Sequence, residues 1–540
     1  MKVRINDSIV RELSFFYIIN IILKIRWCKI VSVNKVLKII TSRIFLTVAL
    51  ILLQVVLVSV AVVQLSIDSR LIVHFIGLLT ILLLLRVVNQ NNIDSGYKIA
   101  WILVLTCIPL VGPVLYLIFA NRKVPKSYRL NTDETIASYR QKIGDTSKVL
   151  ETYSDHHHLY NFQKYVTEEL GNGTFSNTKC KYFGYGEEMF EQWFDDLQQA
   201  KHFILLEYYI IAKGHIWSRL VPLLKEKLAQ GVRVILIYDD FGTITTMNRH
   251  FTKQLESLGL ETVCFNPIKP TLVGTMNYRN HRKLTVIDNK IGYMGGINLA
   301  DEYANLKVRY GRWKDSAIRI EGEAVWGYTV IFLHLYSKLS GKQIDFDWFK
   351  QFGCSIENTG IVTPFADSPN DDDETGLLAH INMLNDAKDY VYICAPYLLL
   401  NDTLLKTIMY TAKRGVDVRI ITPHVPDKFY VHWVSQSFYQ RLVESGVKIY
   451  EYTPGFIHAK TWVSDDIVGI VGTSNIDYRS YYLNFECNTI VSDNEFALSL
   501  RKDFEQTLTI SQPITLKMCQ EVPFIKRLVG AICAVFSPLF

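Results

Sequence analysis

A short pattern of histidine, lysine and aspartate occurs twice in this 540-residue chain. The first copy is His281-Arg282-Lys283 with Asp288, and the second is His458-Ala459-Lys460 with Asp465. One histidine could attack a phosphorus atom while the other protonates the departing alcohol, and the lysines could hold the phosphate oxygens. The repeated residues are therefore candidate catalytic residues of one phosphodiester site: His281, Lys283, Asp288, His458, Lys460 and Asp465.

The match between the copies continues beyond the aspartates. A glycine and an asparagine stand seven and ten residues past each aspartate, at Gly295 and Asn298 and again at Gly472 and Asn475. Glycine lets backbone approach an oxyanion closely, and asparagine can donate amide hydrogens to it. These four residues are therefore predicted to bind phosphate. A single histidine of this kind is more often structural, and the duplication is what favours catalysis.

The spacing within each motif separates side chains by direction. Residues two apart on a strand point to the same face, so His281 and Lys283 can reach one phosphate, as can the corresponding pair in the second copy. Asp288 is seven residues from His281, an odd number, and it opens the turn Asp288-Asn289-Lys290. Although the motif groups this aspartate with the catalytic residues, we expect it to shape the turn instead.

The regions around the motifs repeat each other. A buried strand at Phe203–Leu206, an amphipathic helix at Trp217–Leu228 and a strand at Gly231–Ile237 form a βα pattern. The strands recur in the same order at Tyr390–Ile393 and Gly415–Ile421. This order predicts two homologous α/β halves with pseudo-twofold symmetry. The ligand would bind in the cleft between them, where each half contributes one copy of the motif.

Three apolar segments precede the globular region. Ile44–Leu65 is long enough to cross a bilayer as a helix. Leu71–Leu85 is shorter and would span only if Arg86 snorkels to the interface. Ile99–Ala120 contains prolines and is predicted to be a kinked helix. The sequence thus predicts N-terminal transmembrane helices and a multi-pass membrane protein.

The basic residues that flank these segments predict a different number of membrane crossings from the number of apolar segments. Basic residues cluster before Ile44 and after Ala120, which by the positive-inside rule places both flanks in the cytoplasm and requires an even number of crossings. Three segments give an odd number, and we expect Leu71–Leu85 to be the one that does not cross. The catalytic region is predicted to be cytoplasmic.

The predicted organisation has six parts. They are a basic extension (1–43), a transmembrane region (44–120), a linker (121–160), two halves (161–350 and 351–515) and a C-terminal tail (516–540) that could contact the membrane.

Composition excludes some classes of protein. The nine cysteines are scattered without metal-ligand spacing, which predicts reduced thiols, and the run His156-His157-His158 is interpreted as a solvated loop rather than a metal site. A net charge of +6 suits a protein acting on anionic lipid or on nucleic acid. A nucleic-acid phosphodiesterase is disfavoured by the membrane segments and by the absence of a long basic, aromatic-rich stretch near the motifs.

The paired motifs resemble those of the phospholipase D superfamily, and other segments resemble the cardiolipin synthases of Gram-positive bacteria within it. The resemblance extends from about residue 36 to the C-terminus. It is carried by Lys98–Trp101, Leu206–Ile210, Tyr238–Asp240, Asn277–Lys283, Gly295–Tyr303, Trp313–Asp315 and Tyr452–Lys460.

The resemblance implies a fold of two phospholipase D-like α/β sandwich halves and a reaction without metal or cofactor. Two phosphatidylglycerol molecules in the bacterial cell membrane would give cardiolipin and glycerol through a phosphatidyl-histidine. His281 would be the nucleophile and His458 the acid and base. Lipid hydrolases and other phosphatidyltransferases use the same residues, so they remain alternatives. A non-catalytic scaffold would be expected to have lost a motif residue.

Each histidine also needs a carboxylate to orient its ring. Asp315 and Glu486 are the candidates, because they follow their histidines by 34 and 28 residues, near the positions where the superfamily keeps such acids.

Overall fold

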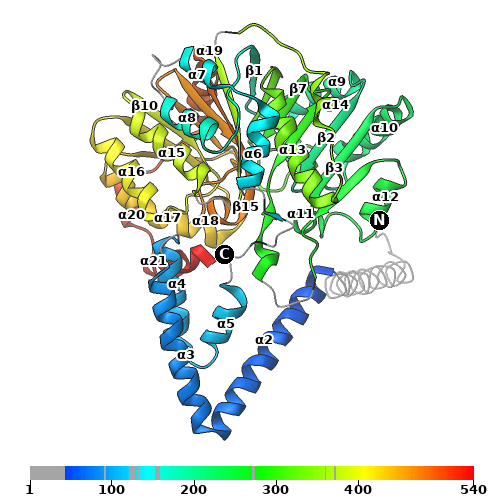
Figure 1. Ribbon diagram of the computed structural model, residues 1–540. Helices are drawn as coiled ribbons and strands as arrows, with labels where there is room; N and C mark the ends of the chain where they lie inside the picture. The colour runs from blue at the N-terminus through cyan, green and yellow to red at the C-terminus, as the bar shows by residue number, and fades with distance from the viewer. Residues whose placement is uncertain are drawn as a thin grey trace, which may run out of the picture. The chain divides into compact units, whose positions relative to one another are not determined.

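The computed structural model describes residues 43–90, 93–120, 124, 128–129, 133–152, 159–269, 274–358, 360–369 and 373–539. The chain divides into two compact units, one of residues up to Ala61 with Lys269–Leu272 and one of Val62–Ile268 with Val273–Phe540. Both motifs and both sheets belong to the second unit, shown in Figure 1. Residues 1–42 of the predicted basic extension and the three-histidine run lie outside the described residues.

The first half contains a seven-stranded sheet in the order β1-β8-β7-β6-β2-β3-β4. Strands β2, β3 and β4 are parallel, and the remaining pairs are antiparallel. The strands are β1 (Thr178–Phe183), β2 (Phe203–Tyr208), β3 (Arg233–Asp239), β4 (Glu261–Phe265), β6 (Lys283–Ile287), β7 (Ile291–Gly295) and β8 (Ala317–Gly322). The main helices are α9 (Gly186–Gln198), α10 (His215–Ala229), α12 (Phe251–Glu256) and α13 (Val325–Ser340).

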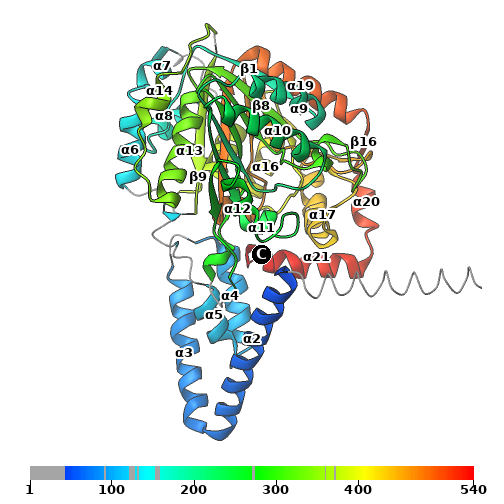
Figure 2. The same cartoon turned by 90° about the vertical axis from the view of Figure 1, so that its right-hand side faces the viewer.

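Strand β2 shows how this sheet is covered on both faces. Every residue of β2 is buried, as expected for a strand between two layers. Phe203 and Leu205 face a core shared with α13 and with the second half, while Ile204 and Leu206 face a core shared with α9 and α10. Helix α13 therefore covers the opposite face of the sheet from α9 and α10 (Figure 2).

The second half contains a nine-stranded sheet that repeats this topology. Its strands follow the order β16-β12-β11-β10-β13-β14-β15-β5, and β9 also pairs with β15. The six strands β12-β11-β10-β13-β14-β15 match β4-β3-β2-β6-β7-β8, so the predicted duplication is confirmed. The strands are β5 (Arg279–Asn280), β9 (Ile361–Asp367), β10 (Tyr390–Cys394), β11 (Asp417–Pro423), β12 (Lys448–Tyr452), β13 (Thr461–Ser464), β14 (Val468–Gly472), β15 (Asn484–Ser492) and β16 (Ser511–Pro513).

Helices cover this second sheet as well. The apolar residues of α15 and α16 pack in one core with β10 and β11, and this core also receives Leu159, Phe162 and Val166 from the segment around α8. Residues 159–166 therefore pack in the second half, although the predicted boundary places residues from 161 onward in the first. The helices are α8 (Tyr160–Glu168), α15 (Thr375–Asp386), α16 (Asp402–Lys413), α17 (Phe429–Glu444), α18 (Tyr478–Tyr482), α19 (Asn494–Leu508), α20 (Leu516–Gln520) and α21 (Phe524–Phe536).

The N-terminal helices correct part of the predicted membrane topology. Among the described residues, one helix is long and apolar enough to cross a membrane, α3 (Arg70–Val88). It contains the segment that we expected not to cross. The first predicted span, Ile44–Leu65, lies within the 26-residue helix α2 (Arg43–Asp68).

The third predicted span is two helices rather than one kinked helix. They are α4 (Ser95–Cys107) and α5 (Gly112–Phe119), and α4, with 13 residues, is only about 20 Å long, against a hydrocarbon core of roughly 30 Å. Gly112 approaches the backbone of α4 too closely for any side chain, and the ring of Trp101 contacts that of Tyr116 at 5.2 Å. The prolines therefore break the segment, and its parts pack against each other.

Candidate active site

His281 is held by a carboxylate from the other half of the protein. Its Nδ1 lies 2.9 Å from both carboxylate oxygens of Glu486 on β15. Thr473 donates a hydrogen bond of 2.6 Å to Glu486 Oε2, and Asn484 donates one of 3.1 Å to Oε1. Burial raises the pKa of Glu486, but His281, Lys283 and Thr473 outweigh it and hold the pKa below its ordinary value. The carboxylate is thus ionised and fixed in position.

His458 has the matching arrangement. Its Nδ1 lies 2.6 Å from Asp315 Oδ2, and the backbone N–H of Ser316 donates to Asp315 Oδ1 at 2.8 Å. Asp315 is fully buried, and its pKa is nevertheless lowered by His458 and Lys460. The two carboxylates singled out in the sequence therefore contact the two histidines, but crosswise: each histidine pairs with the acid of the opposite half, not with the acid that follows it.

Backbone pairing between the halves explains this crossing. Strand β5 ends just before His281 and pairs with the start of β15, and the backbone N–H of His281 donates to Phe485 O at 2.9 Å. In the symmetry-related place, the N–H of His458 donates to Lys314 O at 2.6 Å. Phe485 and Lys314 immediately precede the two carboxylates. Each motif is therefore fastened to the strand that presents the acid of the other half.

Both histidines line one cavity of about 580 Å³. Because each Nδ1 faces a carboxylate, the Nδ1–H tautomer is favoured and Nε2 is left free to react. Burial, reinforced by nearby lysines, lowers the pKa of His281 to about 4 and that of His458 to about 3. Both rings are therefore neutral at neutral pH before substrate binds. An anionic phosphodiester would favour the charged form and raise both pKa values.

The motif lysines lie directly behind the histidines and are buried. Lys283 Nζ donates to the carbonyl of His281 at 2.5 Å, and Lys460 donates to the carbonyl of His458. Burial lowers the pKa of Lys460 to about 8 and also lowers that of Lys283. Each lysine acts electrostatically on the histidine of the other motif as well. The two lysines thus place positive charge beside both histidines, although neither lysine is among the residues that line the cavity.

Aromatic side chains surround the two histidines unequally. Tyr209 contacts the His281 ring at 5.1 Å between centroids. The ring of His458 has three such neighbours, Trp313 at 5.5 Å and Tyr303 and Phe456 at 5.7 Å. The motif spacing did not identify these residues, although all four stand in the segments that carry the family resemblance.

The predicted phosphate-binding residues divide into two groups. Asn298 and Asn475 line the cavity. Asn298 accepts a hydrogen bond from the N–H of Ile210 at 2.9 Å and donates to Tyr303 at 2.7 Å, which leaves one amide hydrogen available. Gly295 and Gly472 are not among the cavity-lining residues.

The prediction that these glycines bind phosphate needs correction. A Cβ at Gly295 would collide with the carbonyl of Ser316, and a Cβ at Gly472 would collide with the side chain of Asn488. Their lack of a side chain therefore serves packing between neighbouring strands.

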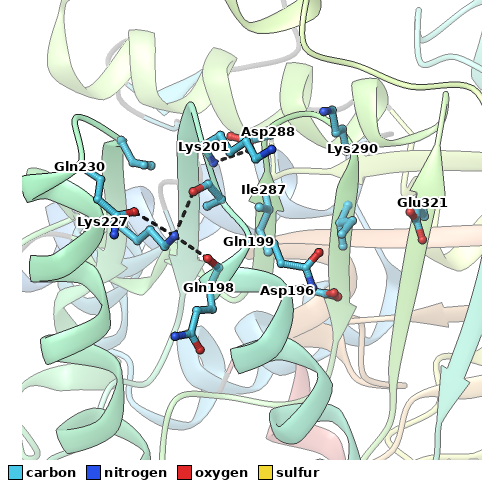
Figure 3. A pocket seen from close by; sticks show the side chains of 13 residues that line it. Asp196, Gln198, Gln199, Lys201, Lys227, Gln230, Ile287, Asp288, Lys290 and Glu321 are labelled. Carbon is cyan, nitrogen blue, oxygen red and sulfur yellow. Dashed lines mark hydrogen bonds between the residues drawn. The ribbon is translucent and has the colours of Figure 1, made fainter.

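The motif aspartates also lie away from the cavity. Asp288 accepts hydrogen bonds from the backbone N–H groups of Lys201, His202 and Phe203 at 2.7–2.8 Å. Figure 3 shows the one from Lys201. Asp465 does the same at the start of β10, with N–H groups of residues 388–390. Both have positive φ, as their turns require. Their grouping with the catalytic residues is corrected: they cap strands.

Replacing Asp288 by alanine should therefore reduce stability rather than chemistry. Three backbone N–H groups would lose a charged acceptor, at a cost of about 3 kcal/mol or more in the free energy of unfolding. Thermal unfolding in detergent would show a lower midpoint, with activity per folded molecule close to normal. A variant of unchanged stability but greatly reduced turnover would contradict this assignment.

A duplicated α/β fold with two HxK motifs and histidine–carboxylate pairs in one cavity defines a phospholipase D-type site. A family model described as "Cardiolipin synthase, PLD-like domain" matches residues 194–310 and 380–508, which contain both motifs, and one described as "Phospholipase_D-nuclease N-terminal" matches residues 78–121. A cardiolipin synthase of Alkalihalophilus pseudofirmus is 32% identical over 88% of this chain and 93% of its own length. The chain therefore belongs to the cardiolipin synthase family.

Other proteins are similar to this chain in sequence or in fold. A cardiolipin synthase of Geobacillus sp. (strain WCH70) is 31% identical over 84% of this chain and 91% of its own length. An uncharacterized protein of Streptococcus mutans is 38% identical over 83% of this chain and 98% of its own. Among solved structures, phosphatidylserine synthase of Haemophilus influenzae Rd KW20 shares the fold, with a TM-score of 0.53 and 16% identity, covering 69% of this chain and 97% of that one.

Proposed function

We propose that this chain is a phosphatidyltransferase that joins two phosphatidylglycerol molecules into cardiolipin and releases glycerol. The observation that carries the proposal is the pair of histidines that line one cavity, each anchored through Nδ1 to a carboxylate. Membership of the cardiolipin synthase family identifies the lipid substrate.

The first step forms a phosphatidyl-histidine. The free Nε2 of His281 attacks the phosphorus of the first phosphatidylglycerol, so a P–N bond forms and the P–O bond to the headgroup glycerol breaks. His458 gives its proton to the departing glycerol oxygen. His458 must be protonated for this step, and the bound anionic phosphate raises its pKa from about 3 in the empty site.

The second step returns the enzyme to its starting state. His458 removes the proton from the 1-hydroxyl of a second phosphatidylglycerol, whose oxygen attacks the phosphorus. The new P–O bond forms, the P–N bond breaks, and cardiolipin leaves. Lys283, Lys460 and the available amide hydrogen of Asn298 stabilise the charge on the non-bridging oxygens in both steps.

An assay of labelled phosphatidylglycerol tests this function directly. Membranes that contain the full-length protein, without added nucleotide, should form cardiolipin and free glycerol in equal amounts. A lipid hydrolase would use water as the acceptor and give phosphatidic acid. Phosphatidic acid as the sole product would therefore reject the transferase in favour of the hydrolase.

We also propose how the enzyme meets the bilayer: α3 crosses it, the catalytic region lies on the cytoplasmic side, and α21 rests in the interface. The interfacial position of α21 is supported by its exposed face, which is apolar rather than polar. Its apolar side chains Phe524, Ile525, Leu528 and Ile532 are 42–72% exposed, whereas Gly530 packs against the backbone of α17. A helix whose apolar stripe faces outward requires an apolar partner.

The surroundings of α21 favour a lipid surface as that partner. Helix α21 contacts α4 and runs crosswise to α3 (Figure 2), so it would lie in the membrane plane if α3 crosses the bilayer. Lys526 and Arg527 near its start match the anionic headgroups of phosphatidylglycerol.

Photo-crosslinking should detect this contact. Benzoylphenylalanine at position 532, in protein reconstituted in phosphatidylglycerol vesicles, is expected to form lipid adducts on illumination. The same residue at position 498 on α19 should not, although Leu498 and Ile532 have similar exposure, 43% and 51%. Crosslinking of position 532 to a second copy of the protein instead of lipid would contradict the proposal.

A further inference from the structure

The active-site cavity is asymmetric in charge at positions where its two halves correspond. Glu302 stands four residues past Asn298, and Arg479 stands four residues past Asn475. Both side chains line the cavity. Since the halves share one topology, opposite charges at matched positions indicate that the two sides of the cavity bind different chemical groups.

Arg479 also differs from the other cations of the cavity. Four arginine and lysine side chains line it, and three have a carboxylate within 4.0 Å, in the pairs Arg279–Asp239, Arg309–Glu302 and Lys428–Asp427. Over the part of the chain that the structure describes, Arg479 has none. Its guanidinium donates only to Asn277, at 2.8 Å to Oδ1 and 2.7 Å to the backbone oxygen. The charges of Asp477 and Asp239 act on Arg479 only at longer range, so its guanidinium can still pair directly with an anionic ligand.

The proposed reaction brings one further anion into this cavity besides the phosphate under attack. The acceptor phosphatidylglycerol carries its own phosphodiester, separated from the attacking hydroxyl by its headgroup glycerol. Arg479 lines the same cavity as both histidines, so its guanidinium lies in the space that the acceptor lipid would enter. The motif lysines serve the phosphate that is being transferred.

We infer that Arg479 binds the phosphodiester of the acceptor lipid and thereby selects a phosphatidyl alcohol over a free alcohol. This inference rests on the proposed function and adds a second phosphate subsite to it. A planar guanidinium can hold two phosphate oxygens at once, which would fix the distance and direction of the acceptor hydroxyl.

The inference separates two reactions of the same intermediate. Free glycerol can also attack the phosphatidyl-histidine: its oxygen forms the new P–O bond, the P–N bond breaks, and its proton passes to His458. This glycerol exchange regenerates phosphatidylglycerol and involves no second phosphate. It therefore requires the histidines and lysines but not Arg479.

The test uses full-length protein in phosphatidylglycerol membranes and measures two products, cardiolipin and phosphatidylglycerol that has incorporated labelled free glycerol. For Arg479→Gln, cardiolipin formation should fall by about 10- to 100-fold, as expected for loss of a charged hydrogen-bond donor, while glycerol exchange stays within about threefold. For Arg479→Lys, the rate of cardiolipin formation should lie between those of Arg479→Gln and the unmodified protein. Lys406→Gln, which removes one positive charge from the exposed surface of α16, should change neither rate.

Equal loss of both reactions in Arg479→Gln would overturn the inference, because the residue would then serve folding or the transferred phosphate. If Arg479→Gln lowers neither reaction, the inference is also overturned. Absence of both reactions from the unmodified protein would instead reject the proposed function, and the inference with it.

Discussion

Replacement of either motif histidine by alanine is expected to lower cardiolipin formation by roughly 10⁴-fold or more. Without His281 no phosphatidyl-enzyme can form, because the attacking nitrogen is missing. Without His458 the attack can still occur slowly, but the second lipid cannot be deprotonated, so the intermediate accumulates. The two variants should therefore be equally inactive and yet differ in covalent labelling.

The measurement is incubation with phosphatidylglycerol labelled at its phosphorus, followed by denaturation at alkaline pH, where a phosphorus–nitrogen bond survives. Label should remain on His458→Ala protein and be absent from His281→Ala protein. The double variant is the control for non-covalent lipid. Label on the His281→Ala protein alone would reverse the assignment of nucleophile and acid, which rests on the family resemblance because the geometry of the two sites is nearly symmetric.

Neutralising Glu486 or Asp315 should cause the second largest loss of turnover. Each substitution should impair the histidine that the carboxylate contacts in the structure. Glu486→Gln removes the charge that orients His281, and Asp315→Asn removes the one that orients His458. An amide keeps the shape but can favour the wrong histidine tautomer, so losses of about 10²- to 10⁴-fold in turnover are expected.

A substrate whose leaving group needs no proton distinguishes the two variants. With a phosphatidyl nitrophenol ester, formation of the phosphatidyl-enzyme no longer depends on the general acid. The initial burst of nitrophenol should then recover in Asp315→Asn, because that residue serves His458, but remain slow in Glu486→Gln. Recovery in Glu486→Gln instead would show that each acid serves the histidine of its own half in solution.

Asp503 offers a matched control for these substitutions. Its carboxylate accepts a hydrogen bond of 2.7 Å from the buried Lys314, which neighbours Asp315, but it contacts neither histidine. Asp503→Asn is therefore expected to lower stability while changing turnover far less than Asp315→Asn. An equal loss of turnover would mean that the effect at Asp315 reflects packing around β8 rather than orientation of His458.

The sequence alone was sufficient for the features that depend on local spacing. The odd spacing between His281 and Asp288 predicted different roles for them, and in the structure His281 lines the cavity while Asp288 caps a strand. The repeated order of strands predicted two equivalent halves, and the sheets follow that order. These predictions succeed because side-chain direction and strand order follow directly from the chain itself.

Other features depended on contacts between distant segments. Gly295 and Gly472 resembled phosphate-binding residues, but their neighbours Ser316 and Asn488 come from adjacent strands, and only the sheet brings them close. The prolines of Ile99–Ala120 are visible in the sequence, but the packing of its two parts through Trp101 and Tyr116 is not. Spacing cannot reveal such contacts, because they are set by how the elements pack.

The paired motifs show most clearly which features the sequence predicted and which only the tertiary structure decided. Their residue types and duplication predicted one phosphodiester site with two histidines and two lysines. Which carboxylate serves which histidine was decided only by the tertiary structure, since β5 leaves its own half to pair with β15 and carries His281 to Glu486. The physical reason is that backbone hydrogen bonds between the halves, rather than distance along the chain, determine which side chains meet.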